Sequence, residues 1–486
     1  MIASTTPGWG LTPALAATTQ GFVVSPFAHE PVARALFLAL PARAGGGWLA
    51  ALRAMIPITD ADGKDEDCAA IAFTATGLDR MGLSDVTMAS FSQPFLQGMG
   101  QADRARRLGD IGDAVIAGGS AWSGNGALAQ STPVGVHVLL LLYARDVTRL
   151  DARCAAAKAS LAAANVSVVR ERDLSLRVDA AGIAREHFGF ADGISQPLPH
   201  GVEILAGGKL APADPLHGVA SGDILMGSLN AHGEPAPGPI APDSPGAAML
   251  PVNDAPFGFR DLGAGGSYLV VRELRQDVAG FWTTMDREAA ALADPAISPE
   301  TLAAKVVGRD QHGQPLSAAA RVGGAPGQPA NGFRYFADDP NGFSCPVGAH
   351  VRRANPRDGL APSATDAPGL LQSANFHRIL RRGRKFGPDI ADPRVDDGRE
   401  RGLLFMCLNT DLVRQFEFVQ QTWMFNPNFH TLKGESDPLV GLASPFTMGA
   451  LPLRRRANVD TFVKFAGGEY FFLPSLPALD YLQTLG

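Results

Sequence analysis

A histidine in the C-terminal half lies in a setting that suits metal or cofactor chemistry. His350 occurs in the segment CPVGAHVRRANPRDG, directly after Gly348 and Ala349. A neutral imidazole is a common metal ligand, and small residues before it would let a planar cofactor approach the backbone. The arginines that follow could pair with carboxylates of such a cofactor, and they are Arg352, Arg353 and Arg357. Taken alone, these residues favour a structural histidine over a ligand.

An aspartate on a glycine-bounded turn is the second candidate. Asp192 lies in HFGFADGISQP, immediately before Gly193. Asp and Gly are frequent in turns, where the carboxylate often bonds its own backbone, so an Asx turn is one interpretation. The functional interpretation is a carboxylate that a tight loop holds over the face of a cofactor.

An arginine in HRILRRGRKFG, residues 377–387, is the third candidate. On a strand, side chains alternate between the two faces of the sheet, so Arg381 shares its face with Ile379 and Gly383. An arginine on an apolar face needs an anion or another polar partner. Arg381 is therefore a stronger site candidate than the arginines beside it.

The elements that must position these residues are clearest in the C-terminal half. Apolar and β-branched runs predict strands, and apolar residues at helical spacing predict helices. Asp411 is expected to cap the second helix. The order is β-α-β-β-α-β, the ferredoxin-like order, over residues 266–274, 277–291, 376–383, 402–410, 412–423 and 462–474.

The N-terminal half gives the same order less securely. Its predicted strands and helices cover residues 21–27, 48–56, 68–75, 136–144, 150–164 and 166–178. Two such units suggest an internal duplication with two packed sheets. We therefore divide the chain into an N-terminal module (1–195), a connection rich in Pro and Gly (196–265) and a C-terminal module (266–486) that carries His350.

Composition narrows the class of protein. The chain has 486 residues and a net charge of -6, which gives no electrostatic reason to expect nucleic acid or an anionic membrane as partner. Its 4 cysteines form no CxxC pair, so a zinc or iron–sulfur site is not expected, and so few thiols fit a reducing compartment. The N-terminus shows neither a secretory nor a twin-arginine signal, and no apolar run reaches the length of a membrane span, so we expect a cytoplasmic protein.

Four segments in a fixed order resemble one family. GFADG with the trailing SQP, GAHVRRANPRD, HRILRRG and GLLFMCLNTDLVRQFEFVQQTW together resemble the dye-decolorising peroxidases. The resemblance runs from about Val136 to the C-terminus and is closest to the larger bacterial and fungal branch. It implies an α+β fold in which two ferredoxin-like βαββαβ modules pack as a dimeric α+β barrel, and it implies haem b as cofactor.

The resemblance also implies roles for individual residues. His350 matches the proximal haem ligand of the family's histidine–arginine–asparagine–proline motif, Asp192 the aspartate of the GxxDG motif, and Arg381 the distal arginine. Asp411, which follows a strand near the C-terminal core, is our hypothesis for the acidic partner of His350; the alternative is its role as a helix cap. The residues expected around the cofactor are Gly193, Arg352, Arg353, Asn355 and Arg357.

The implied activity is reduction of hydrogen peroxide coupled to oxidation of a bulky organic donor such as a dye or a phenol. The chain departs from the family after Arg381, where it has RGRKFG in place of a frequent Met-Pro or Ile-Pro pair. The first alternative is a haem carrier or an iron-removing, deferrochelatase-like protein without peroxidase turnover. A haem-free structural protein with the same fold is the second, and an oligomer is possible in each case.

Overall fold

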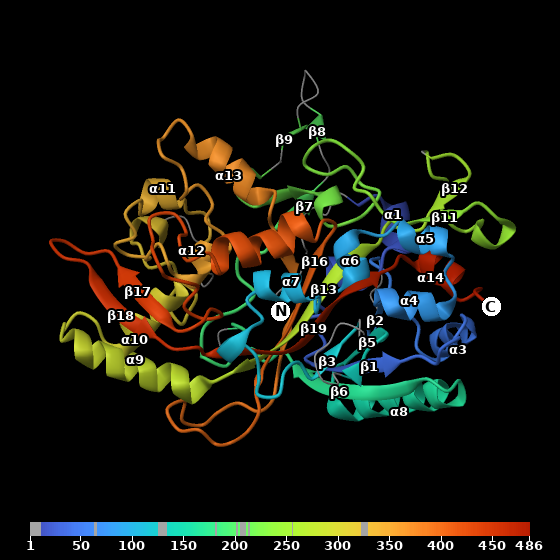
Figure 1. The fold of residues 1–486 in the computed structure, drawn as a ribbon, viewed down its shortest axis with the longest axis horizontal. Helices are drawn as coiled ribbons and strands as arrows, with labels where there is room; N and C mark the ends of the chain where they lie inside the picture. Colours follow the sequence, from blue (N-terminus) through green and yellow to red (C-terminus); the bar gives the residue numbers. More distant parts are fainter. Residues whose placement is uncertain are drawn as a thin grey trace.

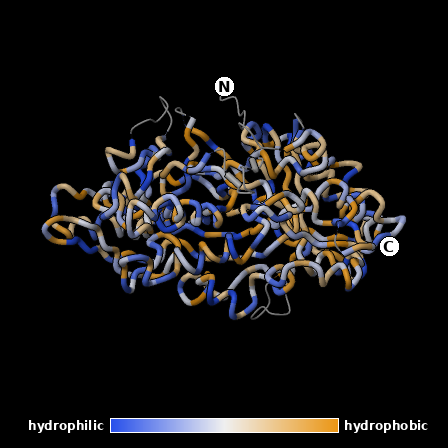
Figure 2. Tube along the Cα trace, turned by 90° about the horizontal axis from the view of Figure 1, so that it is seen from above, coloured by the Kyte–Doolittle hydropathy of each residue, from blue (hydrophilic) through white to orange (hydrophobic). Residues whose placement is uncertain are grey.

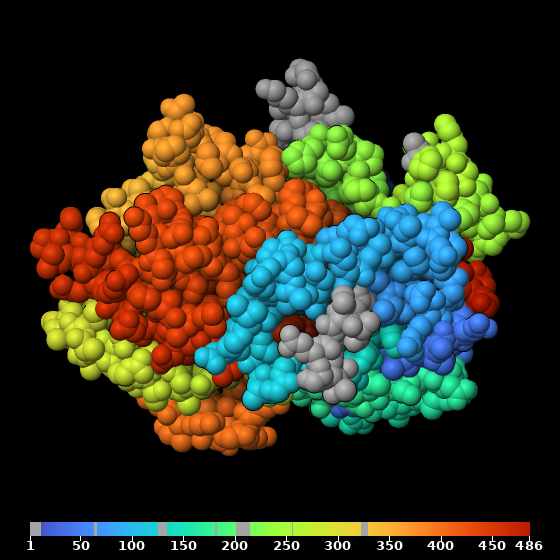
Figure 3. Space-filling model, viewed as in Figure 1, coloured from blue at the N-terminus to red at the C-terminus, as the bar shows by residue number. Residues whose placement is uncertain are grey.

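A computed structural model describes residues 11–62, 66–124, 134–179, 182–200, 203–204, 210–211, 214–254, 256–321 and 329–486. An antiparallel sheet forms its centre, and helices and long connections surround it (Figure 1). In the view from above, hydrophobic segments run through both halves of the molecule, and many of the loops at its edge are hydrophilic (Figure 2). On the face drawn in Figure 3, the C-terminal part (orange and red) and the N-terminal part (blue) meet directly.

The N-terminal module has the ferredoxin-like order. Its elements are β1 (Val32–Ala39), α3 (Gly47–Met55), β2 (Ala69–Phe73), β5 (Val138–Ala144), α8 (Val147–Ala163) and β6 (Ser167–Ser175). The strands lie side by side as β6-β1-β5-β2, and all of their pairings are antiparallel. Helix α8 covers this sheet and packs on α3, β5 and β1 (Figure 1).

The C-terminal module repeats this arrangement. Its elements are β13 (Ser267–Gln276), α9 (Val278–Leu292), β14 (Leu380–Arg381), β15 (Arg384–Phe386), β16 (Gly402–Asn409), two π-helical segments (Val413–Glu417 and Val419–Met424) and β19 (Val463–Leu473). The strand order β19-β13-β16-β15 matches that of the first module.

The two sheets join at both edges into one closed barrel. Phe472 of β19 pairs with Phe73 of β2, and Lys385 of β15 pairs with Ser175 of β6. Inward-facing apolar side chains from both modules fill the interior. Alternate residues such as Leu140 instead pack outward under the covering helices. The predicted α+β fold of two ferredoxin-like modules is thereby confirmed.

Two predicted strands differ from the structure. Residues 21–27 were expected to form the first strand, but Gly21–Val24 is a short helix, α2, and the first strand is β1. Arg382 donates to the carbonyls of Phe22 and Val23, which gives this turn a partner from the other module. The expected strand at 376–383 is reduced to β14, because helix α13 (Ala367–Asn375) extends almost to it.

The remaining elements lie in the connections, before the first strand or after the last one. Among the described residues, no helix is both long and apolar enough to cross a membrane. The helices are α1 (Pro13–Thr18), α4 (Ala75–Met81), α5 (Asp85–Ala89), α6 (Gln93–Gln97), α7 (Ala102–Arg107), α10 (Pro299–Val307), α11 (Tyr335–Asp338), α12 (His350–Ala354) and α14 (Leu476–Leu482). The strands are β3 (Trp122–Ser123), β4 (Val134–Gly135), β7 (Leu198–His200), β8 (Glu203–Ile204), β9 (Leu210–Ala211), β10 (Gly218–Ala220), β11 (Ile240–Pro242), β12 (Phe259–Asp261), β17 (Ser444–Met448) and β18 (Arg455–Val459).

Candidate active site

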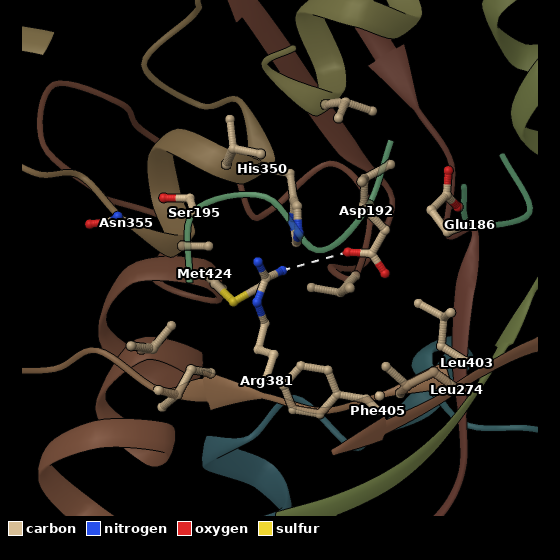
Figure 4. Close-up of a pocket in the computed structure, with 18 of the residues that line it drawn as sticks. Glu186, Asp192, Ser195, Leu274, His350, Asn355, Arg381, Leu403, Phe405 and Met424 are labelled. Carbon is tan, nitrogen blue, oxygen red and sulfur yellow. Dashed lines mark ion pairs between the residues drawn. The ribbon is translucent and has the colours of Figure 1, made fainter. Parts of the chain in front are cut away.

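A cavity of about 470 Å³ lies against the outer face of the C-terminal sheet. Residues of β13, β16 and β19 form its floor, and α12, the π-helical segments and the loop around Asp192 form its walls. Its surface is mainly apolar, with contributions from Leu274, Leu403, Phe405 and Met424 (Figure 4). Most of the site residues that the sequence suggested line it, and they are Asp192, Gly193, His350, Asn355, Arg357 and Arg381.

His350 is the first residue of α12, and its ring points into the cavity (Figure 4). Its Nδ1 lies 3.1 and 3.0 Å from the two carboxylate oxygens of Asp437. Because an ionised carboxylate can only accept, Nδ1 carries a proton, and in the neutral ring Nε2 keeps the lone pair that a metal needs. Burial opposes charge on both groups, yet the Asp437 charge raises the pKa of His350 and the His350 charge lowers that of Asp437.

Asp437 is fully buried and is held by the backbone that follows it. Its Oδ1 accepts hydrogen bonds from the amides of Leu439 (2.9 Å) and Val440 (3.0 Å). Asp411, our sequence-based hypothesis for this partner, instead accepts from the Arg414 amide at 2.9 Å, as a helix cap does. The hypothesis is wrong. Nothing in the local sequence around Asp437 could have identified the true partner.

Asp192 and Arg381 form an ion pair in the same cavity, and both point toward the space that the His350 ring enters (Figure 4). Arg381 Nη1 lies 3.8 Å from Asp192 Oδ1, and 43% of the Asp192 side chain and 35% of the Arg381 side chain are exposed. Both groups can therefore contact a small molecule in the cavity. Ile379, Arg381 and Gly383 line the cavity together, as alternation predicted, and Leu380 packs inside the barrel. Arg378 and Arg382, which alternation placed on the face of Leu380, also line the cavity.

Hydrogen bonds tie the Asp192 loop to the strand of Arg381. Arg381 Nη2 donates to the Ile194 carbonyl at 2.6 Å, and Gln196 bonds both the amide and the carbonyl of Arg381. The Gly193 amide donates to Asp192 Oδ1 at 2.6 Å, in a turn where Gly193 has φ +79°. That conformation favours glycine, which explains why a glycine follows the aspartate in the GxxDG motif.

Glu186 is a cavity residue that the sequence did not suggest. Its carboxylate accepts from the amides of Phe188 (2.8 Å) and Phe190 (2.9 Å) and from Gln276 Nε2 (2.7 Å). Burial raises its pKa to about 7, in spite of these hydrogen bonds. Glu186 therefore anchors the loop that leads to Asp192.

A group of arginines at one end of the cavity lacks sufficient counter-charge. Arg357 donates to the carbonyls of Asn331 and Phe333, and Arg378 Nη2 donates to the Ser195 carbonyl at 2.7 Å. Burial lowers the pKa of Arg357 to about 10 and that of Arg378 to about 9. Arg378 Nη1 is buried without a hydrogen-bond partner among the described residues. This end of the cavity therefore suits an anionic group.

Arg352 and Arg353 do not line the cavity, contrary to what the sequence suggested. Arg352 donates to the carbonyls of Asp339 and Cys345, and Arg353 to those of Trp423 and Met424, among others. Their side chains are buried and hold the connections around α12. Asn355, by contrast, lines the cavity, and its buried Oδ1 has no partner in the described part of the chain.

Comparisons with known proteins agree with this arrangement. A dye-decolorizing peroxidase of Exidia glandulosa is 28% identical over 419 residues, which cover 80% of this chain and 74% of that protein. The multifunctional dye peroxidase DyP2 of Amycolatopsis sp. is 33% identical over 340 residues, or 66% of each chain. A deferrochelatase of Yersinia pestis matches a shorter stretch of 209 residues at 30% identity, 43% of this chain. No family model matches the chain.

Solved structures share the fold over nearly the whole length. A DyP-type peroxidase of Anabaena sp. has a TM-score of 0.73 at 22% identity and covers 96% of this chain and 95% of its own. A dye-decolorizing peroxidase in complex with 2,6-dimethoxyphenol has a TM-score of 0.70 at 25% identity and covers 98% of this chain and 100% of its own. The chain belongs to the DyP-type peroxidase family, as the sequence motifs indicated.

Proposed function

We propose that this protein is a haem peroxidase that reduces hydrogen peroxide and oxidises organic donors such as phenols and dyes. The observation that carries the proposal is the arrangement within one cavity. His350, whose Nδ1 is bound to the buried Asp437, and the Asp192–Arg381 pair all point into this cavity (Figure 4). One pair suits an iron ligand, and the other suits proton transfer and charge stabilisation at a bound peroxide.

The residues of the cavity fit haem b. His350 Nε2 would bind the iron, because Nδ1 is committed to Asp437. The apolar walls suit the porphyrin ring, and Arg378 and Arg357 would hold its propionates, since Arg378 Nη1 has no partner among the described residues. When bound, haem would supply the two electrons that reduce peroxide, and the organic donor would replace them one at a time.

The protein's own groups would handle protons and charge. Asp192 accepts a proton from one oxygen of hydrogen peroxide and returns it to the other oxygen, which leaves as water. The guanidinium of Arg381 lies beside Asp192 and stabilises the negative charge that develops on the departing oxygen. The hydrogen bonds that Arg381 donates to Ile194 and Gln196 of the loop keep both groups in register.

The organic donor is proposed by analogy with the relatives. One solved relative holds 2,6-dimethoxyphenol, and several relatives are described as dye peroxidases. We propose phenols and dyes of similar size as donors here. A donor that cannot enter the cavity would have to transfer its electrons through the protein.

A stopped-flow absorption experiment tests the proposal. Haem-loaded protein is mixed with one equivalent of hydrogen peroxide, and we expect its Soret band to shift within milliseconds. Asp192→Asn should slow this shift by roughly 10²–10⁴-fold, while the exposed control Asp254→Asn should leave it unchanged. Slow bleaching of bound haem with no fast shift would contradict the peroxidase.

The deferrochelatase match, although it covers only 43% of the chain, makes iron removal the second candidate. Release of metal-free porphyrin from the loaded protein, together with the absence of a fast peroxide reaction, would support that activity instead. Failure to bind haem at all would overturn the role given to His350.

A further inference from the structure

A second group of side chains that can bind a metal lies away from the cavity, in the segments that lead into β1 and β2 of the N-terminal module. His29 and Glu30 precede β1, and Cys68 immediately precedes β2. His29 Nε2 lies 3.9 Å from both Glu30 Oε1 and Cys68 Sγ, and the three ligand atoms all lie within 4.8 Å of one another. None of these residues lines the candidate active site.

The backbone holds this group in place before any ion binds. Glu30 is completely buried, and its carboxylate accepts from the amides of Asp67 (2.6 Å) and Cys68 (3.0 Å). Asp67 has φ +70°, a left-handed conformation that costs free energy for a residue other than glycine. The chain therefore accepts local strain where Cys68 and Glu30 come together.

We propose that His29, Glu30 and Cys68 form a binding site for Zn²⁺. Zinc takes thiolate, imidazole and carboxylate ligands in tetrahedral geometry, with bonds of about 2.3 Å to sulfur and about 2.0 Å to nitrogen. Those bond lengths separate sulfur from nitrogen by about 3.5 Å at a tetrahedral angle. The observed 3.9 Å is only a few tenths of an ångström longer. A water completes the four ligands, because 51% of the His29 side chain is exposed.

The surrounding charges are compatible with the ion. Arg153 and Arg384 are the nearby cations, and each directs its hydrogen bonds at main-chain carbonyls: Arg153 at those of Cys68 and Tyr143, Arg384 at that of Glu30 among others. On binding, the Cys68 thiol releases its proton to solvent, and its thiolate and the Glu30 carboxylate together neutralise Zn²⁺. The proposal differs from the expectation based on CxxC pairs, because its ligands come from two separate segments.

An ion at this site would tie together two segments of the N-terminal module, each of which lies next to a contact with the C-terminal module. The loop that carries His29 and Glu30 is held by the C-terminal module, since Arg384 donates to the carbonyls of Pro26 (2.9 Å) and Phe27 (2.8 Å). Cys68 leads into β2, which pairs with β19 at one edge of the barrel. Zinc would therefore stabilise the folded barrel and leave the reaction in the haem cavity intact.

The test uses the haem-loaded full chain with Zn²⁺ added alone, followed by dialysis and metal analysis. We expect about one retained zinc per chain and a higher unfolding temperature. His29→Gln changes an exposed side chain, so it should fold normally, and it should lose the zinc and the thermal shift. His232→Gln, at another exposed histidine, should keep both.

X-ray absorption at the zinc edge provides the second measurement. One sulfur ligand is expected in the native chain and none in Cys68→Ser. Absence of retained zinc, or zinc that persists with unchanged ligands in both His29→Gln and Cys68→Ser, would overturn the site. Neither result depends on the peroxide reaction, so the proposed function stands or falls separately.

Discussion

The imidazole of His350 is bonded to the carboxylate of Asp437 at 3.0 Å, although the two residues are 87 positions apart in the chain. Two backbone amides hold Asp437 from the far side, so its carboxylate is fixed in position before any cofactor binds. A carboxylate that is fixed in this way sets the tautomer and the direction of a ligating imidazole and raises its basicity. The pair therefore prepares one wall of the cavity for a metal.

Removal of the carboxylate charge should weaken haem binding. Asp437→Asn leaves an amide against His350 Nδ1, so the imidazole loses its anionic partner. We expect haem affinity to fall about 10–100-fold, as measured by titration of the apoprotein at its Soret band. Asp411→Asn is the matched control, because Asp411 caps a helix and does not contact His350. Equal losses in the two variants would contradict the role of Asp437.

Arg381 should act on the peroxide reaction more than on haem binding. Arg381→Leu removes the positive charge beside Asp192, so the departing oxygen loses its stabilisation. We expect the reaction of the haem-loaded protein with peroxide to slow about 10²–10³-fold. Arg381→Lys should recover part of the rate, since it restores the charge without the planar guanidinium. An unchanged rate in Arg381→Leu would remove Arg381 from the mechanism.

Arg378 should recognise the carboxylates of haem. The native protein should bind haem more tightly than haem dimethyl ester, because the ester has no charge to pair with the partly unsatisfied guanidinium. Arg378→Leu should remove part of this preference, because Arg357 remains, and should change the affinity for the ester little. The ratio of the two affinities is the measurement, and it controls for a general loss of fold. An unchanged ratio would place the propionates away from Arg378.

The sequence predicted the parts of the site that short motifs encode. Asp192 needs a tight turn, and the adjacent Gly193 shows this requirement directly in the sequence. Alternation along a strand placed Arg381 on the cavity face. Alternation did not predict that Arg378 lines the cavity. Regular pairing in β14 begins only at Leu380, so the alternation of side chains does not extend back to Arg378.

Contacts between distant segments could not be predicted. Asp437 reaches His350 only after the chain has folded, and Glu186 is defined by amides of its own loop and by Gln276 of β13. Arg352 and Arg353 look like anion ligands by charge, yet carbonyls of remote segments take up their guanidinium groups. Charge and motif identify candidates, while tertiary hydrogen bonds decide which of them face the cavity.

His137, which lies outside the site, should make the stability of the fold sensitive to acidic pH. Its Nδ1 accepts from the Leu40 amide at 2.8 Å, which requires a neutral ring. Burial, together with the charge of Arg80, lowers its pKa to about 4. The unfolded chain, with an ordinary histidine pKa of about 6.5, therefore binds a proton that the folded chain does not. The stability from His137 is complete above pH ~6.5 and is lost as the pH falls towards ~4.

His137→Asn should flatten this loss, because Asn Oδ1 can accept from the Leu40 amide and does not titrate. Relative to the native chain, the variant should gain roughly 1–2 kcal/mol in unfolding free energy between pH ~7 and ~4.5, after allowance for partial solvent screening. Urea unfolding at a series of pH values measures the effect, with exposed His232→Asn as control. Parallel pH curves for the native chain and His137→Asn would show that His137 does not contribute to the acid sensitivity of the fold.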